Sequence, residues 1–313
     1  MSCKKDKTLA PISIIEQWQI FGNNNDTVRD LVNTTHFIWA ATQNNGLIKL
    51  DKKTKSLYYF NTSNSALPEN FLTCIVVQND STIWIGTEHF GLIQLNGNNW
   101  TNFNRSNSAL PSNTISSLAL DKNQTLWIGT ANGLANFDGQ FWSTYNQQFS
   151  ATMSGKIRKI KFDNNNTIWV GTQNIGLLTF ENNKWKAMND SNSSLVDNMI
   201  RTIAFDKNNV LWIATFFKFY SYDRNNWMTF DQTNTGISSN YVNDIAIAEN
   251  GDLYFCTHNG FSTFTNGTWT IYNTSNSKLP VNIAEAIVID SFNNKWIGTF
   301  GGIAVYNELG LKL

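Results

Sequence analysis

Charged and polar side chains occupy one repeated position in this 313-residue chain, directly after the first apolar residue of a strand-like segment. The set contains three arginines, one glutamate and three uncharged polar residues: Arg29, Thr73, Ser116, Arg158, Arg201, Asn243 and Glu285. Guanidinium groups bind carboxylates and sulfates through charge-assisted hydrogen bonds. The set therefore predicts a site for an acidic or sugar-like ligand. The alternative is that these side chains pair with one another, or with Asp30 and Asp244.

Four phenylalanines stand in short turns whose sequence is otherwise polar: Phe90, Phe216, Phe217 and Phe300. Exposed aromatic rings at the rim of a cavity can stack on a sugar or another ring. They can equally pack against each other. Phe216 and Phe217 belong to the same repeat as Arg201, and Arg158 belongs to the repeat before it. We therefore expect two cations and two rings in one sector, the combination that an acidic sugar would use.

Catalysis by a general base needs a titratable side chain close to the proton that it removes. The chain has three histidines, His36, His89 and His258. Only His258, together with Glu285 of the next repeat, stands where a lyase or hydrolase could use it, and its sequence context is poor. We expect binding rather than catalysis, with His258 among the ligand-binding residues.

Other motifs of chemistry are missing from the sequence. There is no P-loop, no GxSxG and no HExxH. The turns "DKNQT", "DNNNT" and "DKNNV" lack the glycine and the distal glutamate of an EF-hand calcium loop. Their regular recurrence indicates Asx-type turns instead. We expect neither a metal nor a cofactor.

The segments that carry these residues repeat with a period of about 42 residues. The aromatic residue of the phrase "WIGT" and its variants marks each copy, at Trp39, Trp84, Trp127, Trp169, Trp212, Tyr254 and Trp296. In the third copy, short alternating segments predict four strands, A to D, at Thr114–Asp121, Leu126–Thr130, Gly133–Phe137 and Trp142–Tyr145. Four short strands in each of seven copies predict an all-β fold, a seven-bladed β-propeller.

The two ends of the repeat array complete each other. The segment Trp18–Phe21 matches strand D but precedes the first strand A, whereas the last copy ends with strand C at Gly302–Tyr306. We expect an N-terminal strand at about residues 14–21 to complete the last blade, because closing the ring removes exposed sheet edges. Residues 14–307 then form one domain, with a tether at residues 1–13 and a tail at residues 308–313.

Tryptophan occurs only at two positions of the repeat. Six tryptophans lie in strand B and six lie at the start of strand D (Trp18, Trp100, Trp142, Trp185, Trp227 and Trp269). A residue that binds one ligand has no reason to recur once per blade, whereas a residue packed between neighbouring sheets does. We interpret these tryptophans as scaffold.

Composition excludes several partners. The chain carries 23 Lys and Arg against 23 Asp and Glu, so no excess of positive charge favours nucleic acid.

Cys74 and Cys256 fall in strand-like segments and are expected to be buried. Cys3, within "MSCKKDK", resembles the acylated cysteine of a bacterial lipoprotein whose signal peptide has been removed. A lipid on Cys3 would then be the chain's link to a membrane.

The repeated phrase resembles the two-component regulator propeller repeat, most clearly at Asn113–Phe137 and Asn198–Tyr222. The resemblance implies a sensor-type propeller of the kind found outside the cytoplasm in bacterial signalling proteins, often tied to glycans. Residues 14–307 are similar to a stand-alone member, a lipoprotein of Bacteroidetes type in the periplasm or at the cell surface. Copy five departs from the phrase, with Lys218 in place of glycine.

We expect a monomeric, non-enzymatic module that binds a small molecule or oligosaccharide on the face formed by the B–C and D–A loops. In propellers, those loops surround one mouth of the central channel. The similarity to streptogramin lyases, propellers that use a His and a Glu in the channel, leaves a lyase or hydrolase open. A protein-interaction platform that uses the same rim is the third possibility.

Overall fold

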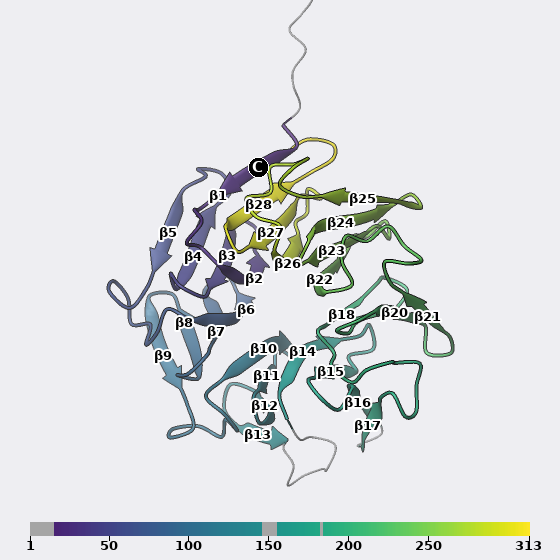
Figure 1. The fold of residues 1–313 in the computed structure, drawn as a ribbon. Coiled ribbons are helices and arrows are strands. Elements are labelled where there is room, and N and C mark those ends of the chain that lie inside the picture. Colours follow the sequence, from purple (N-terminus) through teal and green to yellow (C-terminus); the bar gives the residue numbers. More distant parts are fainter. Residues whose placement is uncertain (1–15, 146–154, 182–183) are drawn as a thin grey trace, which may run out of the picture.

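Seven four-stranded antiparallel sheets surround a central channel in the computed structural model, which describes residues 16–145, 155–181 and 184–313 (Figure 1). The predicted seven-bladed β-propeller is confirmed. Within the described residues every regular element is a strand, and none is a helix of the length and apolarity that a bilayer crossing needs. Cys3 and the predicted tether lie outside these residues.

Each blade runs from an inner strand A to an outer strand D. Blades 1 to 3 comprise β2 (Val28–Asn33), β3 (Phe37–Thr42), β4 (Leu47–Asp51) and β5 (Leu57–Phe60); β6 (Leu72–Asn79), β7 (Thr82–Thr87), β8 (Leu92–Asn96) and β9 (Asn99–Phe103); and β10 (Ile115–Leu120), β11 (Leu126–Thr130), β12 (Gly133–Phe137) and β13 (Trp142–Tyr145). Blades 4 and 5 comprise β14 (Ile157–Phe162), β15 (Ile168–Thr172), β16 (Leu177–Glu181) and β17 (Lys184–Met188); and β18 (Thr202–Phe205), β19 (Leu211–Ala214), β20 (Phe219–Tyr222) and β21 (Trp227–Phe230). Blades 6 and 7 comprise β22 (Val242–Ile247), β23 (Leu253–Thr257), β24 (Gly260–Thr265) and β25 (Thr268–Tyr272); and β26 (Ala284–Ile289), β27 (Lys295–Thr299), β28 (Gly302–Tyr306) and β1 (Trp18–Phe21).

Strand β1 closes the ring as predicted. It pairs antiparallel with β28, with Trp18 opposite Tyr306 and Phe21 opposite Ile303. The Trp18 ring lies 4.6 Å from the ring of Tyr306, and Trp18 is only 7% exposed. The strand is shorter than the predicted range of about 14–21. The C-terminal segment also contacts it, because the amide of Leu311 donates to the carbonyl of Glu16 at 2.9 Å.

The strand B tryptophans pack between blades, which agrees with their interpretation as scaffold. Trp84, Trp169 and Trp296 are at most 2% exposed. The indole N–H of Trp169 donates to Asp163 in the preceding A–B turn, at 3.2 Å, and Trp296 bonds Asp290 in the same way at 2.9 Å. The Asx-type turns thus supply the acceptor that a buried indole needs.

The glycine that opens strand C has a local reason. At Gly46, φ is 75° and an added Cβ would lie 2.2 Å from the carbonyl oxygen of Phe60. Its amide donates to the carbonyl of Asn70, which precedes the next blade, at 3.1 Å. This bond ties the B–C turn to the D–A loop, so the two kinds of loop share one face of the ring.

Strand A differs from the predicted alternation by one residue. In blades other than the fifth, the pairing of strands A and B shifts register at its start, for example between Val28 and Asp30 and between Ile157 and Lys159. Such β-bulges insert one unpaired residue and redirect the side chains around it. The bulged residue is the one that the sequence analysis singled out, such as Arg29 or Arg158.

Candidate functional site

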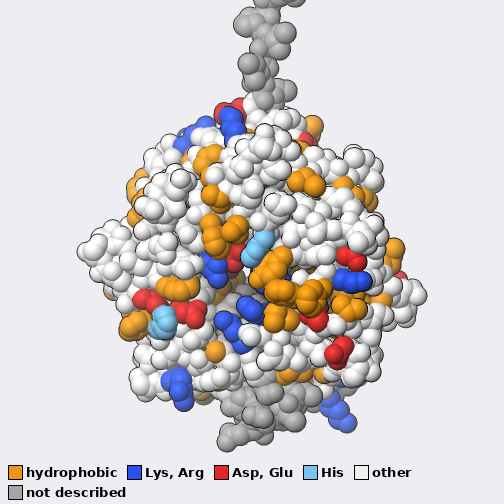
Figure 2. Space-filling model, in the orientation of Figure 1, with side chains coloured by type: hydrophobic (Ala, Val, Ile, Leu, Met, Phe, Trp, Pro, Cys, Tyr) orange, Lys and Arg blue, Asp and Glu red, His pale blue; other side chains and the backbone are white. Residues whose placement is uncertain are grey.

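A cavity of about 600 Å³ occupies the channel and is walled by strand A of several blades. On the face that carries the B–C turns, Figure 2 shows the hollow with Lys and Arg side chains inside it and hydrophobic side chains along its rim. The charged lining residues comprise six cations and four anions: Arg29, Lys156, Arg158, Lys159, Lys161 and Arg201 with Asp30, Glu88, Asp244 and Glu285. The cavity is therefore biased toward an anion.

The predicted ring of polar residues lies at the mouth of this channel, where several members join neighbouring blades. Each of these side chains donates to the carbonyl that begins strand A of the next blade. The bonds are Thr73 to Ile115 at 2.7 Å, Ser116 to Ile157, Arg201 Nε to Val242 at 3.1 Å and Asn243 to Ala284 at 2.8 Å. We call this bond the inter-blade clasp. The ring thus has a structural role that the sequence alone did not reveal.

Glu285 cannot donate such a bond when it is ionised, and it pairs instead with Arg29 of the adjacent blade at 3.1 Å. Burial raises the pKa of Glu285 above its ordinary value, while the charges of Arg29 and Arg201 oppose that shift. The alternative in which ring members pair with each other therefore holds for Arg29 and Glu285. Arg201 also donates to the Asn243 side chain.

Arg158 and Arg201 stand on neighbouring blades and line the same cavity, and neither forms an ion pair among the described residues. The buried Nε of Arg158 also has no hydrogen-bond partner in the described part of the chain. Residues 146–154, which precede its strand, contain no Asp or Glu. Burial lowers the pKa of Arg201, and the like charge of Arg158 lowers it further, against Tyr241 and Glu285. An anionic group placed here would favour the charged form of Arg201 and so oppose the lowering of its pKa by burial and by Arg158.

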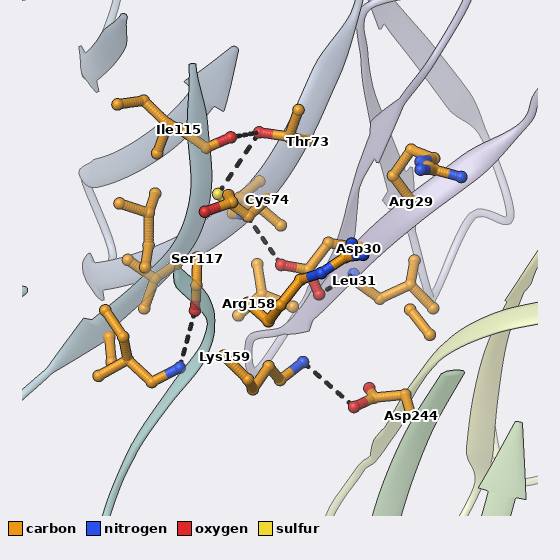
Figure 3. Close-up of a pocket in the computed structure, with 18 of the residues that line it drawn as sticks. Arg29, Asp30, Leu31, Thr73, Cys74, Ile115, Ser117, Arg158, Lys159 and Asp244 are labelled. Atoms are coloured by element: carbon orange, nitrogen blue, oxygen red, sulfur yellow. Dashed lines mark hydrogen bonds and ion pairs between the residues drawn. The ribbon is translucent and has the colours of Figure 1, made fainter. Parts of the chain in front are cut away.

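The carboxylates Asp30 and Asp244 also line the channel, and among the described residues neither forms an ion pair with an arginine. Lys159 Nζ lies 3.1 Å from Asp244 Oδ1 (Figure 3). The same oxygen accepts from the hydroxyl of Thr202 at 2.9 Å. Asp30 accepts the amide of Ile75 at 2.9 Å. Burial alone would lower the pKa of Lys159, but Asp244 and Asp30 raise it above the ordinary value. Lys159 therefore stays charged, and Asp244 is already compensated.

Lys161 is the lone charged residue at its level of the channel. Strand pairing places it opposite Trp169, and the residues opposite the corresponding aromatics are all Ala or Val: Val32, Val76, Ala119, Ala204, Ala246 and Val288. Its side chain is accessible to solvent inside the channel. The surrounding protein and the charge of Lys159 nevertheless lower the pKa of Lys161.

Aromatic rings form a continuous shelf on one side of the mouth. Phe217 contacts Phe216 with ring centres 5.1 Å apart, Phe216 contacts Tyr241 at 5.0 Å, and Tyr241 contacts His258 at 3.8 Å. The guanidinium of Arg201 lies 3.7 Å from the centre of the Tyr241 ring. The structure thus brings together Arg201, Phe216, Phe217 and His258, and it adds Tyr241.

Other predicted residues lie around the rim or away from it. Phe300 is near Arg29, 5.9 Å from its guanidinium carbon. Phe90 is 48% exposed in the turn after β7 and belongs to no ring contact of the shelf. In the same turn, His89 Nδ1 lies 3.0 Å from Glu69. His36 is in an A–B turn at the other end of its blade.

Catalytic chemistry by His258 and Glu285 has limited support in this geometry. Partial burial and the nearby charges of Arg201 and Arg29 lower the pKa of His258, so a neutral imidazole is available as a base. Glu285 is bound to Arg29, and no hydrogen bond joins it to His258 within the described part of the chain. The described residues also contain no cluster of metal ligands.

Sequence comparison identifies two of the repeats. Residues 109–132 and 194–217 match the family model described as two component regulator propeller. These segments lie in the third and fifth copies, where the phrase is clearest, and the predicted resemblance is confirmed. No curated protein matches the chain in sequence.

Solved structures with this fold include sensor domains and lyases. The extracellular domain described as that of a hybrid two component system from B. thetaiotaomicron has a TM-score of 0.80 at 18% identity, over 94% of this chain and 41% of that one. A one component system domain from the same organism has a TM-score of 0.78 at 21% identity, over 93% and 40%. Virginiamycin B lyase from Staphylococcus aureus has a TM-score of 0.75 at 11% identity, over 93% and 98%. The chain thus spans about two fifths of the length of the sensor domains, and at these identities the likeness concerns the fold.

Proposed function

We propose that this chain of two-component regulator propeller repeats is a non-enzymatic, extracytoplasmic ligand-binding propeller of the sensor type. Its ligand is an acidic sugar or an oligosaccharide that contains one. The acidic group binds at the channel mouth between Arg158 and Arg201, and the sugar ring lies against Tyr241 and the aromatic shelf.

One observation carries this proposal. Two arginines on neighbouring blades line the same cavity without an ion pair among the described residues, and the guanidinium of Arg201 stacks on the ring of Tyr241. Charge-assisted bonds from guanidinium groups match the two oxygens of a carboxylate. Aromatic side chains with a few polar groups are typical of ligand pockets.

The location outside the cytoplasm is part of the proposal. Similar domains are described as extracellular. A lipid on Cys3 would hold the protein to a membrane in the periplasm or at the cell surface. Mass spectrometry of the protein purified from membranes tests this anchor, since acylation adds a defined mass to the N-terminal peptide.

Calorimetry tests the binding site. Oligosaccharides of glucuronate and galacturonate are titrated against the protein beside neutral oligosaccharides of the same length. Charge-assisted bonds contribute about 1.5–3 kcal/mol each, so Arg201→Ala should weaken binding of the acidic probe about tenfold or more. Thr73→Val is the matched control, because it removes an inter-blade clasp without removing a charge. Equal affinity for neutral and acidic probes, or equal losses in both variants, would contradict the proposal.

A lyase or hydrolase acting at the mouth is the second candidate, favoured by the neutral His258 on the Tyr241 ring. It predicts that the acidic oligosaccharide is converted to product and that His258→Ala abolishes turnover while affinity changes little. Chromatography of the titrated mixture after several hours distinguishes the two. An unchanged oligosaccharide supports the sensor, and a product that depends on His258 supports the enzyme.

A further inference from the structure

We propose that the pocket beside Phe216 and Phe217 is a second subsite, which takes an uncharged pyranose ring. The ligand would then be an oligosaccharide in which an acidic sugar at the channel mouth is linked to a neutral sugar here. The inference rests on the proposed function for the mouth and adds the second sugar to it.

The pocket has a volume of about 450 Å³ and lies between blades 4 and 5. Three loops form it: the B–C turn of blade 4, the loop from β17 to β18, and the B–C turn of blade 5. They contribute two aromatic rings, one thioether, several amides and one carboxylate, from Gln173, Asn174, Asp197, Asn198, Met199, Phe216 and Phe217. A sugar presents both an apolar C–H face and hydroxyl groups, and this lining offers a partner for each.

Asp197 supplies an acceptor that the protein itself leaves unused. Its Oδ1 accepts the amide of Met199 at 3.0 Å, whereas Oδ2 is buried and has no partner among the described residues. A buried acceptor without a donor costs about 1–3 kcal/mol. Asp197 lines the pocket, and a rotation of its side chain that turns Oδ2 into the pocket would let a hydroxyl of a bound sugar offset this cost. The neighbouring Asn198 is already bonded to Asp190 through its oxygen and its nitrogen.

The charge of Asp197 decides between an acidic and a neutral sugar. A uronate placed against this carboxylate would be repelled, while hydroxyl groups can donate to it. The cations of the mouth have the opposite preference. The two subsites therefore select different sugars, and they fix the orientation of the oligosaccharide.

A departure from the repeat creates this pocket. In blade 4, the amide of Gly176 donates to the carbonyl of Asn198 at 3.0 Å and ties the turn down. Blade 5 has Lys218 in place of glycine, and its amide donates instead to Thr215 of its own turn at 3.3 Å. Lys218 Nζ lies 3.3 Å from Asp231. The turn therefore presents Phe216 and Phe217 outward, 39% and 58% exposed.

The two subsites are continuous through one ring. Phe216 lines the pocket and also contacts Tyr241, on which Arg201 stacks. A sugar over Phe216 and one over Tyr241 would therefore be neighbours. Linking two weak subsites raises affinity because the second contact becomes intramolecular.

Saturation-transfer NMR with single sugars tests the subsite directly. The probes are the methyl glycosides of glucose, galactose and mannose, with sodium glucuronate as the acidic probe. We expect at least one neutral glycoside to bind, with its signal lost about fivefold or more in Asp197→Asn and in Phe217→Ala, and unchanged in Arg201→Ala. Phe141→Ala, which removes a 66% exposed ring from another turn, is the matched control. The subsite is overturned if no neutral glycoside binds, or if Asp197→Asn and Phe217→Ala bind it like the wild type or the control.

Failure of the subsite and failure of the mouth give different results. If glucuronate binds and its binding is lost in Arg201→Ala, while no neutral glycoside binds, the second subsite is rejected and the site at the channel mouth is kept. If a neutral glycoside binds and glucuronate does not, the site at the mouth is rejected and the second subsite is kept. If both hold, a disaccharide of glucuronic acid and the neutral sugar should bind about tenfold tighter than either alone. Self-association in sedimentation that disappears in Phe217→Ala would instead make the two rings a protein interface and would overturn the proposal.

Discussion

Two sets of aromatic residues in this molecule differ in how regularly they recur among the blades and in how exposed they are. Trp84 recurs at the same place in nearly every blade, is 2% exposed and donates its indole N–H to Gln78 at 2.9 Å. Phe217 has no counterpart in most blades and is 58% exposed. The first set faces the neighbouring blade, which offers the same slot each time. The second lies on the face that carries the B–C turns, beside a pocket between two blades, where no repeated slot receives it.

The difference teaches that departures from the repeat are the places to look for function in this chain, because packing alone does not require them. A position that every blade fills alike serves the packing of sheet on sheet. The ring of polar residues at the channel mouth combines a repeated structural role and a departure from the repeat at one position. The Thr73 hydroxyl makes the inter-blade clasp and a contact with its neighbour Cys74, whereas Arg201 makes the clasp with Nε and extends its guanidinium over Tyr241.

Removing the closing strand should have the largest effect on the scaffold side of this comparison. Deletion of residues 1–22 removes β1 with the buried rings of Trp18 and Phe21 and leaves the edge of β28 open. Loss of one large buried aromatic costs about 3–5 kcal/mol, and this deletion removes two. Calorimetric melting measures the change, with deletion of residues 1–15 as the control. An unchanged melting temperature would show that β1 does not stabilise the ring.

Trp84→Ala tests a periodic aromatic away from the shelf. We expect a loss of about 3–5 kcal/mol in the free energy of unfolding, because the cavity between blades 2 and 3 cannot be refilled. Urea denaturation measures it. The protein that remains folded should bind the acidic probe with wild-type affinity. Abolished binding at unchanged stability would move Trp84 from the scaffold to the site.

Asp163→Asn tests the turn that supports a periodic tryptophan. Burial tends to raise the pKa of Asp163, but bonds from the amide of Thr167 and the indole of Trp169, with the charge of Arg224, lower it below the ordinary 3.8. A carboxylate whose pKa is lower in the folded state stabilises the fold at pH values above its unfolded pKa. This stabilisation is lost as the pH falls through the folded pKa. The wild type should therefore lose stability in acid below about pH 4.

The variant should be less stable at neutral pH by about 1–3 kcal/mol and should lose less on acidification. Urea denaturation at several pH values measures both quantities. Asp80→Asn, at an exposed turn position, is the control. Parallel pH profiles for wild type and Asp163→Asn would show that this carboxylate does not contribute to acid sensitivity.

Phe217→Ala should have the smallest effect on stability and so sharpens the contrast. Surface substitutions away from special features change the free energy of unfolding by about 0.5 kcal/mol or less. The same variant should weaken binding of the neutral sugar. If it destabilised the protein as Trp84→Ala does, the distinction between the two aromatic sets would fail.

The sequence was a good guide to the fold because each blade repeats the same local pattern. In the third copy, strands B to D match the predicted ranges, and strand A, predicted at Thr114–Asp121, is Ile115–Leu120. The end residues belong to turns: the carbonyl of Thr114 accepts the amide of Ala131, and Asp121 caps its own turn.

The site was only partly predictable, for two physical reasons. Simple alternation places Lys159 on the side opposite to Arg158, but the bulge lets both residues line the channel. Tyr241 and Asp197 belong to D–A loops, whose path depends on contacts with the next blade. A signal for the second pocket was nevertheless present, since Lys218 interrupts the repeated glycine beside the two phenylalanines.

The pairing of β1 with β28 also determines how the molecule responds to force. Trp18, at the beginning of β1, lies opposite Tyr306, at the end of β28, and the chain leaves the sheet in both directions from that point. Tension between the two ends would load this pair first and separate its hydrogen bonds one after another, rather than shear them together. The ring would therefore open at a low force while the other six blades keep their strands. A pull from one end alone, as from a single anchor, would leave the pair unstressed.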